Sequence, residues 1–291
     1  MNHPTHARRP LPTNRLNRRA FALTALTGSA VLGLAACGAG GSGSGSGSGD
    51  DTLIKVASHL PPMTDVVTTA AEAAQEEGYT VELVQVSDNV QYNRLLADGE
   101  VDANFAQHEP YMQAFNEEND ADLVLLDKIY DAKVGFYSKD HDDVEQVPEG
   151  AKVALPNDAS NEGRALAMLH DQGLITLPED AGFEGRVDDI VDDPLGLEFV
   201  LIDLLNLPSA YEEDGMALVY SYPSYIEKVG LTPADALFLE ETVDQRFSIS
   251  LIAREDNQDS EQIQVLRRAM TSDAVRTFLE EEHSATLTPA F

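Results

Sequence analysis

The chain has 291 residues, 43% of them hydrophobic, which is sufficient for one large domain or two lobes. Its formal net charge is −32 at pH 7, so it repels nucleic acid and anionic lipid headgroups and we expect no nucleic-acid partner. The simplest explanation of the acidity is solubility. A single cysteine excludes an internal disulfide.

The amino terminus has the features of an export signal. Five arginines and no acidic residue occur in residues 1–36, and an uncharged apolar run covers residues 20–36. At 17 residues the run is short for a membrane-spanning helix. It ends in Leu34-Ala35-Ala36-Cys37, which resembles the lipobox where bacteria attach diacylglycerol to cysteine and cleave just before it. We therefore expect a signal peptide at 1–36 and a lipid on Cys37.

Two further features describe the region around the anchor. Asn17 to Leu23 also resembles a twin-arginine export motif, so the export route stays open. Residues 37–52 hold the cysteine and a tract of almost pure glycine and serine, a composition typical of a flexible tether. This arrangement predicts a globular body on the extracytoplasmic face of the cell membrane, anchored by lipid.

The first part of the body alternates strands with helices. Strand-like segments cover residues 52–58, 80–86, 101–107 and 123–126. Helical segments cover residues 65–77 and 92–98, and another helix begins at Pro110. Such alternation predicts an α/β fold with a mostly parallel sheet and helices on both faces.

The pattern then restarts. Residues 133–138 could carry the chain out of a first lobe, and strands at 152–155, 199–202 and 216–220 belong to a second. A strand at 247–253 could return to the first lobe, followed by helices at 261–270 and 273–282. We expect lobe 1 at 53–134 and 248–291 and lobe 2 at 135–247. A ligand would bind in the cleft between the two lobes.

A strand-to-helix junction at residues 155–164 is the first candidate site. Ser160 or Asn157 is expected to cap the helix, with Asn161, Gly163 and Arg164 in its first turn. Backbone N–H groups at a helix start favour an anion, and a guanidinium can hold a carboxylate through two bonds. The junction could bind an acid group; an ordinary capped helix with a solvated arginine is the alternative.

A second junction, Asp102 to Tyr111, combines amides, an imidazole and aromatic rings. No catalytic motif, phosphate loop or zinc motif occurs in the sequence, and His108 with Glu109 does not make a metal site. We therefore expect no enzyme activity, no cofactor and no metal. With Asn157, Asn161 and Arg164, these groups suit the binding of a small zwitterion.

Several motifs together resemble the methionine-binding lipoproteins, the NlpA lipoprotein family. The resemblance runs from about Leu53 to the last helices and implies a two-lobed, periplasmic-binding-protein-like fold. Its motifs are Asp102-Ala103-Asn104, Gln107-His108 with Pro110-Tyr111, Pro156-Asn157-Asp158, Asn161 with Gly163-Arg164, Gly173-Leu174-Ile175, Gly230 to Ala234 and Arg254 to Asn257. The resemblance implies that Arg164 and Asn161 hold the α-carboxylate of an amino acid and that His108 lies against the ligand.

Four positions depart from the family pattern. Asn89 replaces an aromatic residue, and Ala106 replaces a phenylalanine, with Phe105 one position earlier. Tyr222 and Ser250 each stand where the family has a ligand-contacting asparagine. The residues that the resemblance assigns to the carboxylate are therefore kept, whereas the side-chain pocket and part of the amine site are changed. All four of Asn89, Phe105, Tyr222 and Ser250 remain candidate ligand contacts.

The expected function is that of a lipid-anchored receptor of an ABC importer. It would bind an amino acid, with methionine as the first expectation, and deliver it to a permease driven by a cytoplasmic ATPase. A different amino acid or a short peptide is an alternative within the same class. A surface-anchored adhesin or signalling protein is an alternative from another class.

Overall fold

The computed structural model describes residues 52–291, and three predictions for the amino terminus lie outside these residues. They are the signal peptide at 1–36, the lipidated Cys37 and nearly all of the tether. None of the helices among the described residues combines the length and hydropathy that a membrane span requires.

The first sheet has six strands in the order β11-β4-β10-β3-β1-β2. The β1 strand pairs in parallel with β2 and β3, whereas β10 is antiparallel to β3 and β4, and β11 is antiparallel to β4. The strands are β1 (Leu53–Ser58), β2 (Thr80–Gln85), β3 (Ala103–Gln107), β4 (Leu123–Ala132), β10 (Ile249–Arg254) and β11 (Leu287–Pro289).

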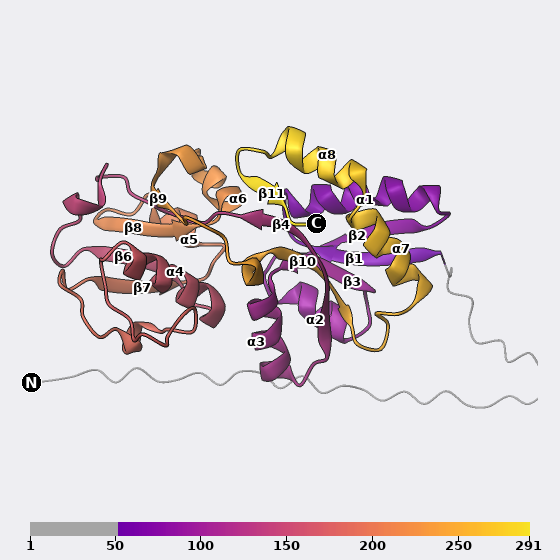
Figure 1. Ribbon diagram of the computed structural model, residues 1–291, viewed down its shortest axis with the longest axis horizontal. Coiled ribbons are helices and arrows are strands. Elements are labelled where there is room, and N and C mark those ends of the chain that lie inside the picture. Colours follow the sequence, from indigo (N-terminus) through magenta and orange to yellow (C-terminus); the bar gives the residue numbers. More distant parts are fainter. Residues whose placement is uncertain (1–51) are drawn as a thin grey trace, which may run out of the picture. The chain divides into compact units, whose positions relative to one another are not determined.

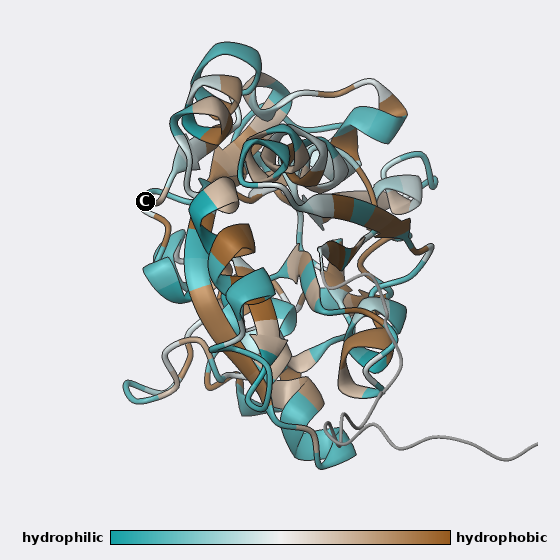
Figure 2. Cartoon of the chain, turned by 90° about the vertical axis from the view of Figure 1, so that its right-hand side faces the viewer, coloured by the Kyte–Doolittle hydropathy of each residue, from teal (hydrophilic) through white to brown (hydrophobic). Residues whose placement is uncertain are grey.

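Helices lie on both faces of the first sheet (Figure 1). They are α1 (Met63–Glu76), α2 (Gln91–Ala97), α3 (Glu109–Asn119), α7 (Glu261–Met270) and α8 (Asp273–Glu282). Buried residues of α1 recur at helical spacing, at Val66, Val67, Ala70 and Ala74, so one stripe of this helix joins the core. Figure 2 shows hydrophobic residues gathered on the strands and hydrophilic residues on the outer helix surfaces.

The second sheet has five strands in the order β7-β6-β8-β5-β9. Here β6 pairs in parallel with β7 and β8, and β5 is antiparallel to β8 and β9. The elements are β5 (Gly135–Tyr137), β6 (Lys152–Pro156), α4 (Ala159–Asp171), β7 (Glu198–Ile202), α5 (Leu207–Ala210), β8 (Met216–Ser221), α6 (Pro223–Ile226) and β9 (Ala236–Leu239).

The predicted α/β class with two sheets is confirmed, and both sheets are mixed. The chain passes from the first sheet to the second between β4 and β5 and returns between β9 and β10. The β4 strand extends to Ala132, well beyond the predicted end at Leu126, so it reaches the region where the chain changes sheets. Strands β9 and β11 were not predicted from the sequence.

Candidate functional site

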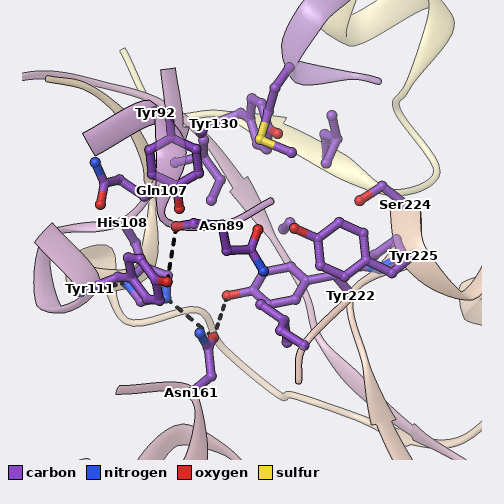
Figure 3. Close-up of a pocket in the computed structure, with 17 residues that line it drawn as sticks. Asn89, Tyr92, Gln107, His108, Tyr111, Tyr130, Asn161, Tyr222, Ser224 and Tyr225 are labelled. Carbon is purple, nitrogen blue, oxygen red and sulfur yellow. Dashed lines mark hydrogen bonds between the residues drawn. The ribbon is translucent and has the colours of Figure 1, made fainter. Parts of the chain in front are cut away.

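A pocket is lined by side chains from both sheets and their helices. It contains about 510 Å³ of space free of protein atoms, part of it open to solvent. Figure 3 shows the polar and aromatic side chains that converge on it. The lining residues are Met63, Asn89, Tyr92, Ala106, Gln107, His108, Tyr111, Tyr130, Ala132, Asn161, Leu204, Tyr222, Pro223, Ser224, Tyr225, Ile249 and Leu287.

The β6–α4 junction positions Asn161 on the pocket wall. Asp158 caps α4 by accepting a hydrogen bond from the Asn161 backbone N–H at 3.0 Å. The prediction that Ser160 or Asn157 caps this helix is therefore wrong. The same carboxylate accepts a side-chain N–H group of Asn161, whose Nδ2 lies 3.0 and 3.1 Å from its two oxygens. This contact fixes the side-chain amide of Asn161 and turns its Oδ1 atom toward His108 and Tyr222. Burial raises the pKa of Asp158, although these hydrogen bonds oppose the shift.

His108 caps α3 from the end of β3 and faces Asn161. Its Nδ1 accepts a hydrogen bond from the Tyr111 backbone N–H at 3.3 Å, which places the ring proton on Nε2. The Nε2–H group therefore donates to Asn161 Oδ1, 3.3 Å away (Figure 3). Burial and the positive charge of Arg164 lower the pKa of His108 to about 3. The imidazole is thus neutral and joins a residue of the first sheet to one of the second.

Tyr222, just before α6, connects Asn161 to Arg164. Its hydroxyl donates to Asn161 Oδ1 at 2.9 Å and accepts from Arg164 Nη1 at 3.0 Å. Asn161 Oδ1 therefore accepts two hydrogen bonds, one from His108 at the end of β3 in the first sheet and one from Tyr222 just after β8 in the second. The Tyr222 hydroxyl is the group through which the buried guanidinium reaches the pocket.

Arg164 is completely buried and is not a lining residue of the pocket. Its Nε and Nη2 donate to the two carboxylate oxygens of Glu240 at 3.0 and 2.6 Å, and Nη2 also donates to the Ala132 carbonyl at 3.1 Å. The guanidinium carbon lies 4.5 Å from the centre of the Phe247 ring. Burial disfavours the charge, but Tyr222 and Glu240 more than offset this and the pKa of Arg164 is raised. The alternative of a solvated arginine is therefore wrong.

The other candidate residues are distributed over different environments. Asn89 lines the pocket. Phe105 is fully buried in the first sheet, where its ring meets Tyr130 edge-on at 5.8 Å. Ser250 is also fully buried and donates to the Ser248 carbonyl at 2.8 Å. Asn157 is exposed on an adjacent groove. In this structure Phe105, Ser250 and Asn157 do not line the pocket.

Several lining residues were not identified as ligand contacts from the sequence. Five of the nine tyrosines of the chain line the pocket; Tyr222 was a predicted ligand contact, and the other four are Tyr92, Tyr111, Tyr130 and Tyr225. His59 supports this wall, with Nε2 2.9 Å from the Tyr225 hydroxyl, and burial, helped by the charge of Lys228, lowers its pKa to about 4. Tyr222 and Tyr225 both lie at α6, but the other three come from α2, α3 and β4, so no local sequence pattern indicates this wall.

A closed network of amides supports the β3 end of the pocket. Gln107 donates to Asn93 and to Asn104, the latter at 3.0 Å, and accepts from Asn93 at 2.8 Å. All three side chains are buried. Because Gln107 has used both N–H groups, it shapes the wall and offers no donor to a ligand.

The pocket has the chemistry of a binding site. Within residues 52–291 no group of three or more histidine, cysteine or acidic side chains could hold a metal ion. The polar groups that face the cavity are hydroxyls, side-chain amides and the neutral imidazole of His108, with a buried guanidinium behind them. Such a set can orient a zwitterion by hydrogen bonds within an aromatic wall.

Known proteins resemble the chain along almost all of this folded body. The profile of the NlpA lipoprotein family matches residues 54–291. The D-methionine-binding lipoprotein MetQ of Salmonella typhimurium is 34% identical over 256 residues, which cover 87% of this chain and 91% of that protein. A YaeC-family lipoprotein of Enterococcus faecalis is 43% identical, with a TM-score of 0.75 over 82% of this chain and 100% of that chain. A nutrient-binding protein of Burkholderia cenocepacia, solved bound to methionine, is 30% identical with a TM-score of 0.77 over 82% of this chain and 100% of that chain.

Proposed function

Since this chain belongs to the NlpA lipoprotein family, a family of substrate-binding proteins and not of enzymes, we propose that it is the receptor of an ABC importer for methionine. The receptor is anchored through a lipid on Cys37 to the extracytoplasmic face of the cell membrane. It passes its ligand to a permease and its ATPase.

Two lobes enclose the ligand in this proposal. Lobe 1 comprises residues 53–134 and 248–291, and lobe 2 comprises residues 135–247. The contact between His108 Nε2 and Asn161 Oδ1 at 3.3 Å carries the proposal, because it joins polar groups of the two sheets across the pocket. A ligand bound there contacts both lobes, so its binding energy favours the closed form that the permease recognises.

The hydrogen bonds of the pocket suggest how each end of a free amino acid is bound. On binding, the Tyr222 hydroxyl turns its single proton from Asn161 Oδ1 to the ligand carboxylate, while its oxygen continues to accept from Arg164 Nη1 at 3.0 Å. The ammonium group donates to Asn161 Oδ1, whose orientation Asp158 fixes. This division differs from the one implied by family resemblance, because it assigns the carboxylate to the Tyr222 hydroxyl and the ammonium group to Asn161 Oδ1.

The side chain of the ligand lies among the tyrosines. A thioether is polarizable and packs well against aromatic rings, and each sulfur–aromatic contact contributes about 0.3–1.5 kcal/mol. The rings of Tyr222 and Tyr225, with centroids 5.6 Å apart, and the ring of Tyr92 supply such surfaces. Methionine matches this wall and is also the ligand of the Burkholderia cenocepacia relative.

Native mass spectrometry of the purified full-length chain in detergent tests the ligand directly. We expect a bound species of the mass of methionine, and isothermal titration calorimetry of the ligand-free chain is expected to show one methionine per chain. A chain that binds neither a dipeptide nor any member of a panel of the twenty amino acids in either assay would contradict the receptor function.

Another amino acid or a short peptide is the second candidate for the ligand. The observation that favours it is Asn89, a small amide on the pocket wall where the family has an aromatic ring. Competition of labelled methionine by the amino-acid panel and by dipeptides separates the two candidates.

A further inference from the structure

A second cavity, which we call the outer groove, adjoins the pocket. It contains about 1310 Å³ of space free of protein atoms, including its opening to solvent. The pocket and the outer groove share Asn89, Tyr111 and Leu204, so these three side chains form the partition between them. The other lining residues of the outer groove are Asp88, Val90, Arg94, Ala114, Phe115, Glu118, Asn119, Asn157, Asp158, Ala159, Ser160 and Asp203.

Asn89 is the unusual member of this partition. Its side chain is only 8% exposed, yet its amide makes no hydrogen bond to another described residue, whereas its backbone carbonyl accepts from the Tyr111 hydroxyl at 3.0 Å. Figure 3 shows the amide directed into the pocket, toward Tyr222. The nitrogen and oxygen of this amide remain accessible from the pocket, so a ligand can reach both. The free amide of Asn89 therefore points to a ligand group with both a donor and an acceptor.

The outer groove is acidic. It is lined by four carboxylates, those of Asp88, Glu118, Asp158 and Asp203, against the single guanidinium of Arg94. Burial and the charges of these four carboxylates raise the pKa of the Tyr111 hydroxyl in the partition. The negative potential thus extends to the boundary with the pocket, and it favours a cationic group on the ligand.

We propose that the site also takes a dipeptide, whose carboxyl-terminal residue occupies the pocket and whose amino-terminal ammonium group lies in the outer groove, with the peptide group beside Asn89. This inference rests on the proposed receptor function and names the ligand class of the same site.

The dipeptide satisfies groups that a free amino acid leaves unpaired. Its peptide carbonyl accepts from the Asn89 amide, and its peptide N–H donates to Asn161 Oδ1 in place of the ammonium group. The carboxylate remains on the Tyr222 hydroxyl. Consecutive Cα atoms lie about 3.8 Å apart, so one additional residue extends the ligand by about this distance toward the outer groove.

Calorimetry of the full-length chain in detergent tests the proposal with three probes, methionine, alanylmethionine and N-acetyl-alanylmethionine. We expect alanylmethionine to bind at least tenfold more tightly than methionine. Acetylation removes the ammonium charge while it keeps the peptide group, so we expect N-acetyl-alanylmethionine to lose most of this gain.

Two variants test the residues that the proposal names. Asn89→Phe restores a ring at the partition and is expected to lower the ratio of dipeptide to methionine affinity at least fivefold. Glu118→Gln removes one charge of the outer groove and is expected to weaken alanylmethionine more than methionine. Glu117→Gln is the matched control, because Glu117 is exposed on the same helix but does not line the outer groove.

The outcomes separate the two proposals. Equal affinity for methionine and alanylmethionine, or equal affinity for the free and acetylated dipeptides, would overturn the dipeptide assignment and leave the methionine receptor intact. A chain that binds neither these probes nor any amino acid would overturn the receptor function as well. An unchanged affinity ratio in Asn89→Phe would also overturn the assignment.

Discussion

Arg164 and Glu240 form a two-bond ion pair in the interior, with Nε–Oε1 and Nη2–Oε2 distances of 3.0 and 2.6 Å. Both side chains are buried, with 0% and 7% of their surface exposed. Glu240 therefore neutralises the guanidinium from the side opposite Tyr222. In the proposed binding mode the carboxylate of the ligand therefore contacts a hydroxyl polarised by a paired cation, and not a free cation.

The variant Glu240→Gln removes the negative partner and leaves the charge of Arg164 buried. We expect it to destabilise the fold by about 3 kcal/mol, since loss of one partner leaves a buried charge uncompensated. The net positive charge behind Tyr222 should at the same time increase methionine affinity at least threefold. Thermal unfolding and calorimetry measure the two effects, and a variant that loses both stability and affinity would contradict the neutralising role of Glu240.

The variant Arg164→Ala is expected to weaken methionine binding at least tenfold, because the Tyr222 hydroxyl loses the donor that positions and polarises it. It also leaves Glu240 buried without a cation, so the fold is destabilised. The double variant Arg164→Ala with Glu240→Ala should recover stability but not affinity. Wild-type affinity in both variants, measured by calorimetry, would remove Arg164 from the binding mechanism.

The variant Tyr222→Phe tests the hydroxyl itself. The ring and its packing remain, but the hydrogen bonds to Arg164 and Asn161 are lost, and we expect methionine affinity to fall at least tenfold. Tyr220→Phe is the matched control, because the buried Tyr220 hydroxyl has no hydrogen-bond partner among the described residues. Its removal should leave affinity unchanged and stability unchanged or higher. Equal affinities of the two variants would exclude a role for the Tyr222 hydroxyl.

Local sequence signals were sufficient for the framework of the fold. The last two helices were predicted with the bounds that the structure shows, because Ser260 and Ser272 cap α7 and α8 and apolar residues follow at helical spacing. The end of β4 was missed, because most of the strand is only half-buried and includes Asp127 and Lys128. Its pairing with β10 and β11 extends it, which is tertiary information.

The candidate site was only partly predictable from the sequence. His108 and Asn161 stood out because each lies at a strand-to-helix junction of a recognisable motif. Glu240 carries no such signal, since it follows Arg164 by 76 residues and pairs with it only in the folded chain. Phe105 stands one position before the phenylalanine of the family pattern. Because a shift by one position turns a strand side chain to the other face, Phe105 lies in the core and does not line the pocket.

The depressed pKa of His108 predicts a loss of stability in acid. Its pKa is about 3 in the folded chain, compared with about 6.5 when unfolded. Between these values the unfolded chain binds more protons, so the free energy of unfolding falls as the pH falls below 6.5. At pH 5 the loss is about 2 kcal/mol for His108 alone. Melting curves of His108→Gln should therefore change less between pH 7 and pH 5 than those of the wild type; identical changes would contradict the buried neutral imidazole.

The variant Gly163→Ala is expected to disturb the site by displacing Phe183, which packs against a ring that contacts Arg164. A methyl group there would overlap the Phe183 carbonyl oxygen and lie 2.7 Å from its carbonyl carbon. Phe183 packs edge-on against Phe247 at 5.0 Å, and Phe247 contacts the guanidinium of Arg164. Displacement of this backbone should destabilise the fold by about 1–3 kcal/mol and weaken methionine binding several-fold.

Gly185→Ala is the matched control for this prediction, because it adds the same methyl group to the loop that contains Phe183. The nearest atom to that methyl group is a Leu177 side-chain carbon at 3.4 Å, close to an ordinary van der Waals contact. We expect its melting temperature and methionine affinity to stay close to the wild-type values. If Gly163→Ala behaved like Gly185→Ala in both measurements, the stack from Phe183 through Phe247 to Arg164 would have no part in holding the guanidinium.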